Sequence, residues 1–199
     1  MIYDRRIAPG DRGASWAASL LGERVLPAGM DLVEEPLRPG AAASRPFDAE
    51  GLPVASRAFV ADGVLTSWVL DLASARQLGM SSTGNAMRGA SSTPSPGTSN
   101  IRLTPGAMTL EEMLAEMGTG LLVTSMIGAS ISATTGDYSR GASGFWIENG
   151  QIAYPVNEIT VAGNLKRMLG GLTAASDADE TKSAVVPSLL VEGLTVAGG

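Results

Sequence analysis

The chain has 199 residues, of which 44% are apolar, 17% charged and 5% aromatic, a composition typical of globular proteins. Acidic residues outnumber basic ones by 20 to 14, and the basic ones are scattered along the chain, which disfavours a nucleic-acid partner. Cysteine and histidine are both absent. This excludes disulfides, zinc sites built from Cys or His, and catalytic triads with a histidine base. Carboxylate-only metal binding, carboxylate acid/base pairs, and Ser or Thr chemistry assisted by Lys or the N-terminal amine stay open.

The N-terminal part predicts little regular structure. Residues 11–22 favour a short helix that ends at Gly22. The proline-rich stretch 25–46 predicts extended chain on the surface. The N-terminal residues Met1–Arg6 carry charges where a signal peptide needs an apolar core, so the sequence gives no indication of secretion.

The first clear element is a β-hairpin. Strands over 58–61 and 64–70 flank Asp62-Gly63, a dipeptide that supplies the positive φ angles of a type I′ turn. Asp71 or Ser74 then caps a short helix over 73–78. Residues 81–100, rich in Ser, Thr, Pro and Gly, predict a long loop of the kind that is either mobile or functional.

The next elements are a brief strand over 101–103 and a helix. Thr109 and Glu112 form a capping box that opens this helix, which continues to about Met117. Residues 117–136 carry no charge, but their many Gly, Ser and Thr residues predict a buried strand and turn rather than a membrane helix. The β-prone part of this stretch is 121–127.

The C-terminal part predicts further strands. Asn149-Gly150 is the strongest hairpin signal and pairs 145–148 with 151–154. Residues 158–165 predict a strand that passes into a helix, and 188–196 predict a final strand. Together these patterns predict an α+β protein of mostly antiparallel strands, forming a partial β-barrel or curved sheet with three or four short helices.

Candidate ligand-binding residues gather in the segment 135–144, which is rich in backbone amides and side-chain donors. It supplies a carboxylate, a phenol and a guanidinium, and the candidate peptide- or ligand-binding residues are Thr135, Asp137, Tyr138, Ser139 and Arg140. A structural alternative is that Asp137 and Arg140 pair to fix a turn. An acid/base pair of Asp137 with Glu158 is a further option that no spacing rule supports. The sequence contains no Walker A motif, dinucleotide fingerprint or nucleophile elbow.

Several long motifs, taken in order, resemble one family. The C-terminal motifs are TGDYSRGASGFWIENG at 135–150, YPV at 154–156, EITVAGNL at 158–165 and EGLTVAG at 192–198. The upstream motifs are IYDRR at 2–6, FDAEG at 47–51, STGNA at 82–86 and PSPGTSN at 94–100. In this order they resemble the C-terminal domain of the TldD/PmbA family, also called modulator of DNA gyrase, on the PmbA (TldE) side.

The resemblance implies a bacterial, cytoplasmic pair of proteins that forms a metalloprotease acting on unfolded peptides. TldD carries a zinc-binding HExxxH motif and PmbA does not, and the absent histidines agree with the PmbA side. The resemblance therefore implies a non-catalytic subunit with no metal or cofactor of its own, a zinc-bearing TldD-type partner and a partial β-barrel. Residues 1–199 are expected to form a single domain that lacks the family's N-terminal domain, and 10–23 appear shorter than the family's corresponding stretch.

Two other functions stay open. The first is a stand-alone structural or small-ligand-binding domain, in which the 135–144 segment holds an anion on its amides. The second is a self-sufficient hydrolase that uses Ser or carboxylates. No nucleic-acid or membrane partner is expected, and a homodimer is one option for assembly.

Overall fold

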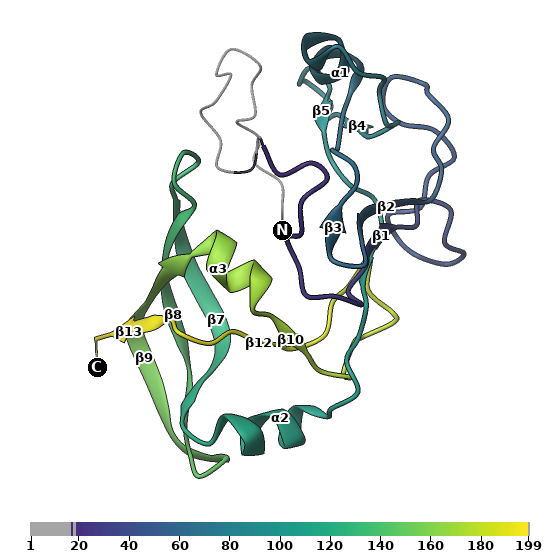
Figure 1. Ribbon diagram of the computed structural model, residues 1–199. Coiled ribbons are helices and arrows are strands. Elements are labelled where there is room, and N and C mark those ends of the chain that lie inside the picture. The colour runs from purple at the N-terminus through teal and green to yellow at the C-terminus, as the bar shows by residue number, and fades with distance from the viewer. Residues whose placement is uncertain (1–16, 18, 199) are drawn as a thin grey trace. The chain divides into compact units, whose positions relative to one another are not determined.

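The computed structural model describes residues 17 and 19–198, which form two compact units (Figure 1). Unit 1 contains the chain up to Thr104 together with Asp179–Val186, and unit 2 contains Pro105–Ala178 together with the chain from Pro187 onward. Most of the helix predicted over 11–22 lies outside the described residues. Among the helices of the described chain, none is both long and apolar enough to span a membrane.

Unit 1 is built on a five-stranded sheet in the order β11-β6-β1-β2-β3. Its strands are β1 (Leu32–Glu34), β2 (Arg57–Ala61), β3 (Val64–Leu65), β6 (Ile101–Leu103) and β11 (Ala184–Val185). All neighbours are antiparallel except β11 and β6, which are parallel. Phe59, Val60, Leu65, Leu103 and Val185 are buried and contribute to its core.

The prediction of surface chain over 25–46 is wrong for three residues. β1 lies inside this stretch and is the central strand of the sheet, hydrogen-bonded to β2 and β6. The prolines nearest to it, Pro27 and Pro36, stand outside the strand, so none of its ladder hydrogen bonds is lost.

Turn and cap chemistry explains the elements that follow. Asp62 and Gly63 take φ angles of 47° and 77° between β2 and β3, which confirms the predicted turn, but β3 ends at Leu65 and not at residue 70. A Cβ on Gly63 would lie 2.3 Å from the Leu26 carbonyl oxygen, so only glycine fits there. Helix α1 (Leu72–Leu78) is capped by Asp71, whose carboxylate accepts from the Ser74 amide, and ends at Gly79 with φ 66°.

The segment 81–100 is tied to the sheet of unit 1 by buried polar groups. It forms β4 (Ala86–Met87) and β5 (Ser95–Pro96), which pair with each other. The carboxylate of Glu34, only 2% exposed, accepts hydrogen bonds from the Asn85 amide group (2.7 Å) and from the Ser99 backbone amide (2.6 Å) and hydroxyl (2.8 Å). The long loop predicted here is therefore anchored at both ends by one carboxylate of β1.

Unit 2 is dominated by a curved four-stranded antiparallel sheet in the order β13-β9-β8-β7 (Figure 1). Its strands are β7 (Gly120–Ile131), β8 (Asp137–Glu148), β9 (Gln151–Asn164) and β13 (Thr195–Ala197). The unit also contains helices α2 (Leu110–Met117) and α3 (Leu165–Gly170) and the paired strands β10 (Thr173–Ala174) and β12 (Leu189–Leu190). The antiparallel α+β class with curved sheets is confirmed, and the described strands do not close into a barrel.

The predicted elements of unit 2 are largely confirmed. Thr109 and Glu112 form the capping box of α2, and Asn149-Gly150 turns β8 into β9 with φ angles of 51° and 75°. The single strand predicted over 188–196 is instead split into β12 and β13. Gly193 separates them with φ 72°, a conformation that breaks an extended run.

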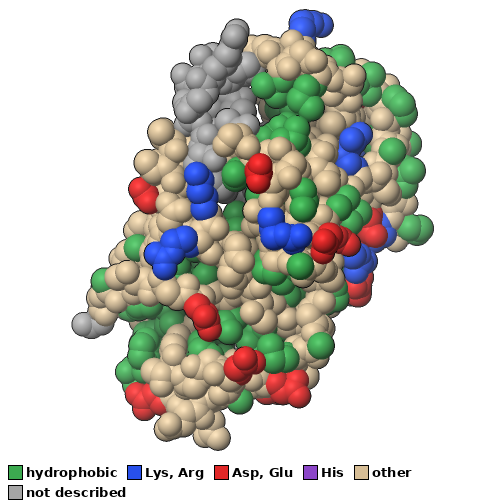
Figure 2. All heavy atoms as spheres, in the orientation of Figure 1, with side chains coloured by type: hydrophobic (Ala, Val, Ile, Leu, Met, Phe, Trp, Pro, Cys, Tyr) green, Lys and Arg blue, Asp and Glu red, His purple; other side chains and the backbone are tan. Residues whose placement is uncertain are grey.

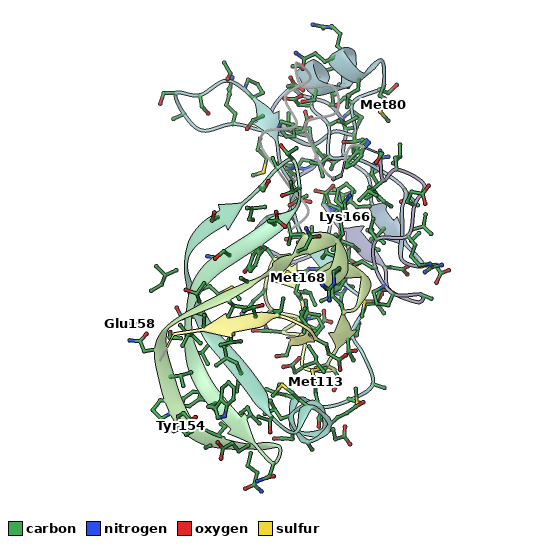
Figure 3. The ribbon with its side chains drawn as sticks, turned by 60° about the vertical axis from the view of Figure 1, so that its left-hand side comes forward. Met80, Met113, Tyr154, Glu158, Lys166 and Met168 are labelled. Atoms are coloured by element: carbon green, nitrogen blue, oxygen red, sulfur yellow. The ribbon has the colours of Figure 1, made fainter. Side chains whose placement is uncertain are left out.

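One face of the large sheet forms the core of unit 2. Ala142, Ile159 and Val161 are buried there, and Leu121, Val123, Val156 and Leu194 pack against them. Helix α3 lies on this concave side, and the sulfur of Met168 is within 3.4 Å of a Cβ placed on Gly163 of β9 (Figure 3). The burial predicted for 117–136 is wrong, however, because Thr124 to Gly128 are exposed; β7 is an edge strand, so only its first residues reach the core.

A bulge interrupts β9 at Glu158. Ala142 and Gly144 of β8 face Ile159 and Val156 of β9, so β9 has one extra residue between these pairs. Glu158 takes φ 54°, a left-handed conformation that costs a residue with a Cβ about 1–2 kcal/mol. Figure 3 shows Glu158 at the outer side of β9, away from α3.

The Glu34 network predicts a large effect of a small change. Glu34→Gln removes the buried charge and places an NH₂ group among donors, so we expect the free energy of unfolding to fall by about 2–3 kcal/mol. Urea denaturation measures this loss. The matched control is Glu35→Gln, at a partly exposed ion pair with Arg102, which should cost less than about 1 kcal/mol. Equal losses in the two variants would contradict the central role of Glu34.

The Glu158 bulge predicts a change of opposite sign. Glu158→Gly relieves the left-handed backbone, so we expect the free energy of unfolding to rise by about 1 kcal/mol. Thermal denaturation measures the gain. Glu148→Gly, at an exposed position with ordinary strand φ in β8, is the control and should destabilise the protein. A destabilised Glu158→Gly variant would show that the Glu158 side chain makes a larger contribution than its backbone strain.

Candidate functional site

The candidate residues lie at the β7–β8 connection of unit 2, where Ser132 organises the turn. The Ser132 hydroxyl accepts from the Thr135 amide at 3.1 Å, and its carbonyl accepts from the Gly136 amide at 2.9 Å. The Ser132 amide in turn donates to the Asp137 carbonyl at 2.8 Å. The segment 135–144 is strand from Asp137 onward, because β8 pairs with both β7 and β9 along its length.

Asp137 is held by a local network of hydrogen bonds. Its carboxylate accepts from the Thr135 hydroxyl at 2.6 Å and from the Asn164 side-chain amide at 3.0 Å. The same Asn164 group donates to the Thr135 carbonyl, and the Asn164 side-chain oxygen accepts from the Lys166 amide at the start of α3. The Thr135 hydroxyl, followed by Asn164, keeps the pKa of Asp137 below its ordinary value. These bonds join the β7–β8 turn to the end of β9.

The other candidates point to two different faces. Successive residues of a strand alternate between faces, so Asp137 and Ser139 share one face and Tyr138 and Arg140 the other. The Tyr138 hydroxyl contacts the Met126 sulfur at 3.3 Å. The Arg140 Nε donates to the Gly128 carbonyl at 2.5 Å, while Ser139 stands between Ser130 of β7 and Ala162 of β9. The strand thus distributes Asp137, Tyr138, Ser139 and Arg140 over both faces of the sheet, while Thr135 stands in the turn before it.

Neither pairing suggested for Asp137 occurs. The Asp137 carboxylate is bonded to Thr135 and Asn164, whereas Arg140 lies on the opposite face and bonds a carbonyl of β7. Asp137 faces Asn164, six residues along β9 from Glu158, which corresponds to about 20 Å of extended strand. An acid/base pair of Asp137 with Glu158 is therefore excluded by the strand register.

A second polar cluster, in unit 1, was not indicated as a site by any spacing in the sequence. Besides Glu34 it contains buried Asp48, Asn85 and Asn100. Asp48 accepts from the amides of Glu50, Leu52 and Ala86, so it fixes a turn. The side-chain oxygens of Asn85 and Asn100 have no hydrogen-bond partner among the described residues. Nearly all the other polar groups of this cluster bond within unit 1, which indicates a structural role.

Metal ligation finds little support in the described residues. Among residues 17 and 19–198, no group of three or more Asp and Glu side chains lies close enough to hold an ion. The surface shown in Figure 2 has acidic and basic side chains interspersed, with no basic patch on that face. The chemistry that the chain offers is hydrogen bonding from strand edges, turns and exposed apolar side chains.

The fold and the site define the class of the protein, which is an α+β protein with a long curved antiparallel sheet. A family model described as the PmbA/TldA metallopeptidase C-terminal domain matches residues 9–198. The chain belongs to this family.

Individual relatives agree with this assignment. The metalloprotease PmbA of Escherichia coli O157:H7 is 43% identical over 188 residues, which cover 94% of this chain and 40% of that protein. A solved structure from Bacteroides thetaiotaomicron, described as a candidate modulator of DNA gyrase, has a TM-score of 0.81 and 31% identity over 94% of this chain and 40% of its own. TldE from Thermococcus kodakarensis has the same fold, with a TM-score of 0.80 and 23% identity over 93% of this chain and 43% of its own. The chain thus spans about 40% of the length of these relatives, and the resemblance to the PmbA side is confirmed.

The network around Asp137 predicts a measurable shift in its titration. Thr135→Val removes the hydroxyl that contributes most to the lowered pKa, so the pKa of Asp137 should rise toward its ordinary value of 3.8. The stability that Asp137 contributes is present above that value and is lost as the pH falls through its lower folded pKa, so this loss should begin at higher pH in the variant. Carbon-detected NMR of the carboxyl group measures the shift. Ser139→Ala, which does not contact Asp137, should leave it unchanged, and an equal shift in both variants would contradict the network.

Proposed function

We propose that this chain is a non-catalytic part of a TldD/PmbA-type metalloprotease that binds unfolded peptides beside a zinc-bearing TldD-type subunit. One observation carries the proposal: a member of a metallopeptidase family contains no histidine at all, so it has no ligands for an imidazole-bound zinc. In this proposal hydrolysis takes place outside these 199 residues, on the zinc-bearing TldD-type subunit. In this proposal the present chain supplies surfaces rather than reacting groups.

The surface it would supply is the long sheet of unit 2. Strands β7, β8 and β9 are 12, 12 and 14 residues long, and β7, as the edge strand, presents main-chain donors and acceptors on the side away from β8. Such edges hold an extended peptide by hydrogen bonds that are independent of the peptide sequence. Within the proposal, Tyr138, Ser139 and Arg140 serve as peptide contacts, and Thr135 and Asp137 hold the adjoining turn in place.

The proposal is tested by reconstitution. This chain is mixed with a zinc-bearing TldD-type protein, and cleavage of an unfolded peptide is followed together with the mass of the mixture by light scattering. We expect a mixed complex and a peptidase activity that neither protein shows alone. Because zinc belongs to the partner, a chelator should abolish this activity.

Two controls separate the parts of this result. A TldD-type protein whose motif glutamate is replaced by glutamine should still form the complex but lose the activity, because that residue acts on the zinc-bound water. Activity that survives this replacement would place the chemistry on the present chain and contradict the proposal. Failure of the two proteins to associate, with folding of each confirmed by circular dichroism, would contradict the proposed partnership.

A further inference from the structure

Methionine is the only sulfur-containing residue of this chain, which has nine methionines and no cysteine. A peroxide converts the methionine thioether to a sulfoxide, provided that it reaches the sulfur from solvent. Among the described residues, the exposed methionines are Met80, Met87 and Met126, at 43%, 43% and 40%. Exposure therefore selects three positions and does not distinguish between them.

Hydrogen bonding distinguishes Met126 from the other two. Its Sδ atom accepts from the Tyr138 hydroxyl at 3.3 Å, and no other methionine sulfur receives a hydrogen bond within residues 17 and 19–198. A thioether sulfur is a weak acceptor, so this hydrogen bond contributes little while Met126 is reduced. The oxygen of a sulfoxide is a strong acceptor, and the hydroxyl that points at the sulfur is in place to donate to it.

The strand register places a second donor beside this pair. Met126 of β7 lies opposite Ala142 of β8. Residues of a strand alternate between faces, so Tyr138 and Arg140 share the face of Ala142. The Arg140 Nε donates to the carbonyl of Gly128, two residues beyond Met126, which holds the guanidinium at β7. In the described part of the chain, its two Nη groups have no hydrogen-bond partner and no ion pair, so they are free to donate.

We propose that Met126 is a site of reversible oxidation, at which a peroxide forms a sulfoxide whose oxygen is held by Tyr138 and Arg140. In the forward step the sulfur lone pair forms the S–O bond, the O–O bond of hydrogen peroxide breaks, and water leaves. The sulfur is oxidised and the peroxide is reduced. Reduction by a dithiol returns the thioether, with a disulfide and water as the other products. The sulfoxide oxygen carries partial negative charge, so the guanidinium of Arg140 strengthens its binding.

The same donors act on the rate of oxidation. Negative charge develops on the departing oxygen as the O–O bond breaks, and donors beside the sulfur stabilise it. Met126 should therefore react faster than Met80 and Met87, although its exposed fraction is no greater than theirs. One hydrogen bond of ordinary strength corresponds to a rate ratio of about fivefold to tenfold.

Treatment of the folded chain with hydrogen peroxide tests the proposal and requires no protease partner, so it is independent of the proposed function. Peptide mapping by mass spectrometry follows the sulfoxide fraction of each methionine over time. We expect Met126 to react about fivefold to tenfold faster than Met80 and Met87. Tyr138→Phe should remove this difference. Tyr154→Phe is the matched control, because Tyr154 is 50% exposed on β9 and its hydroxyl bonds to no described residue, and it should leave the rate at Met126 unchanged.

A second experiment tests the guanidinium and the reversibility. Arg140→Gln, with its fold confirmed by circular dichroism, should slow oxidation at Met126 and leave the rate at Met80 unchanged. Incubation of the oxidised chain with methionine sulfoxide reductases and dithiothreitol should restore the original mass at Met126. The comparison of the exposed methionines in the wild-type chain depends on no variant. Equal rates at all three, an unchanged rate at Met126 in Tyr138→Phe, or a sulfoxide that the reductases do not remove would overturn the proposal.

Discussion

The buried carboxylate of Glu34 is the constraint on which unit 1 depends. A charge removed from water must be matched by donors, and here the donors come from Asn85 and Ser99, near the two ends of the 81–100 segment. One side chain on the central strand β1 thereby determines the path of a segment whose composition alone predicts a loop. Stability of the sheet and order in the segment are consequently coupled, because neither end of 81–100 can leave without exposing an unpaired carboxylate.

Unit 2 is held together mainly by backbone hydrogen bonds between long strands, and not by a buried charge. Small residues such as Gly141, Ser143 and Gly144 in β8 allow close neighbours; a Cβ on Gly144 would lie 1.9 Å from the Leu122 carbonyl oxygen. The same pairing explains why the residues from Thr135 to Arg140 do not converge on a ligand: a strand sends alternate side chains to opposite faces. Contacts spread along a strand suit an extended polypeptide better than a compact small molecule.

The sequence predicts best those features whose cause is local. Asp62-Gly63, Asn149-Gly150 and the capping box of Thr109 and Glu112 each determine a turn or a helix start by the chemistry of two residues, and the structure has all three. The sequence predicts poorly those strands and side-chain networks that depend on residues far away along the chain. β1 has three residues in a proline-rich stretch and owes its strand to β2 and β6. The Asp137 network depends on Asn164, 27 residues away, which no spacing rule connects to it.

The wrong prediction of burial for residues 117–136 has the same cause, because the sequence does not reveal which strand is the edge of its sheet. An uncharged run such as Met117–Gly136 is expected to be buried, and within the described chain much of it is not, since β7 is the edge of its sheet. Among the described residues no second strand lies on that side of β7, so its main-chain donors and acceptors are open to another polypeptide. Strand pairing requires no reactive side chain, so in a chain without histidine or cysteine this edge suits the proposed binding of extended peptides.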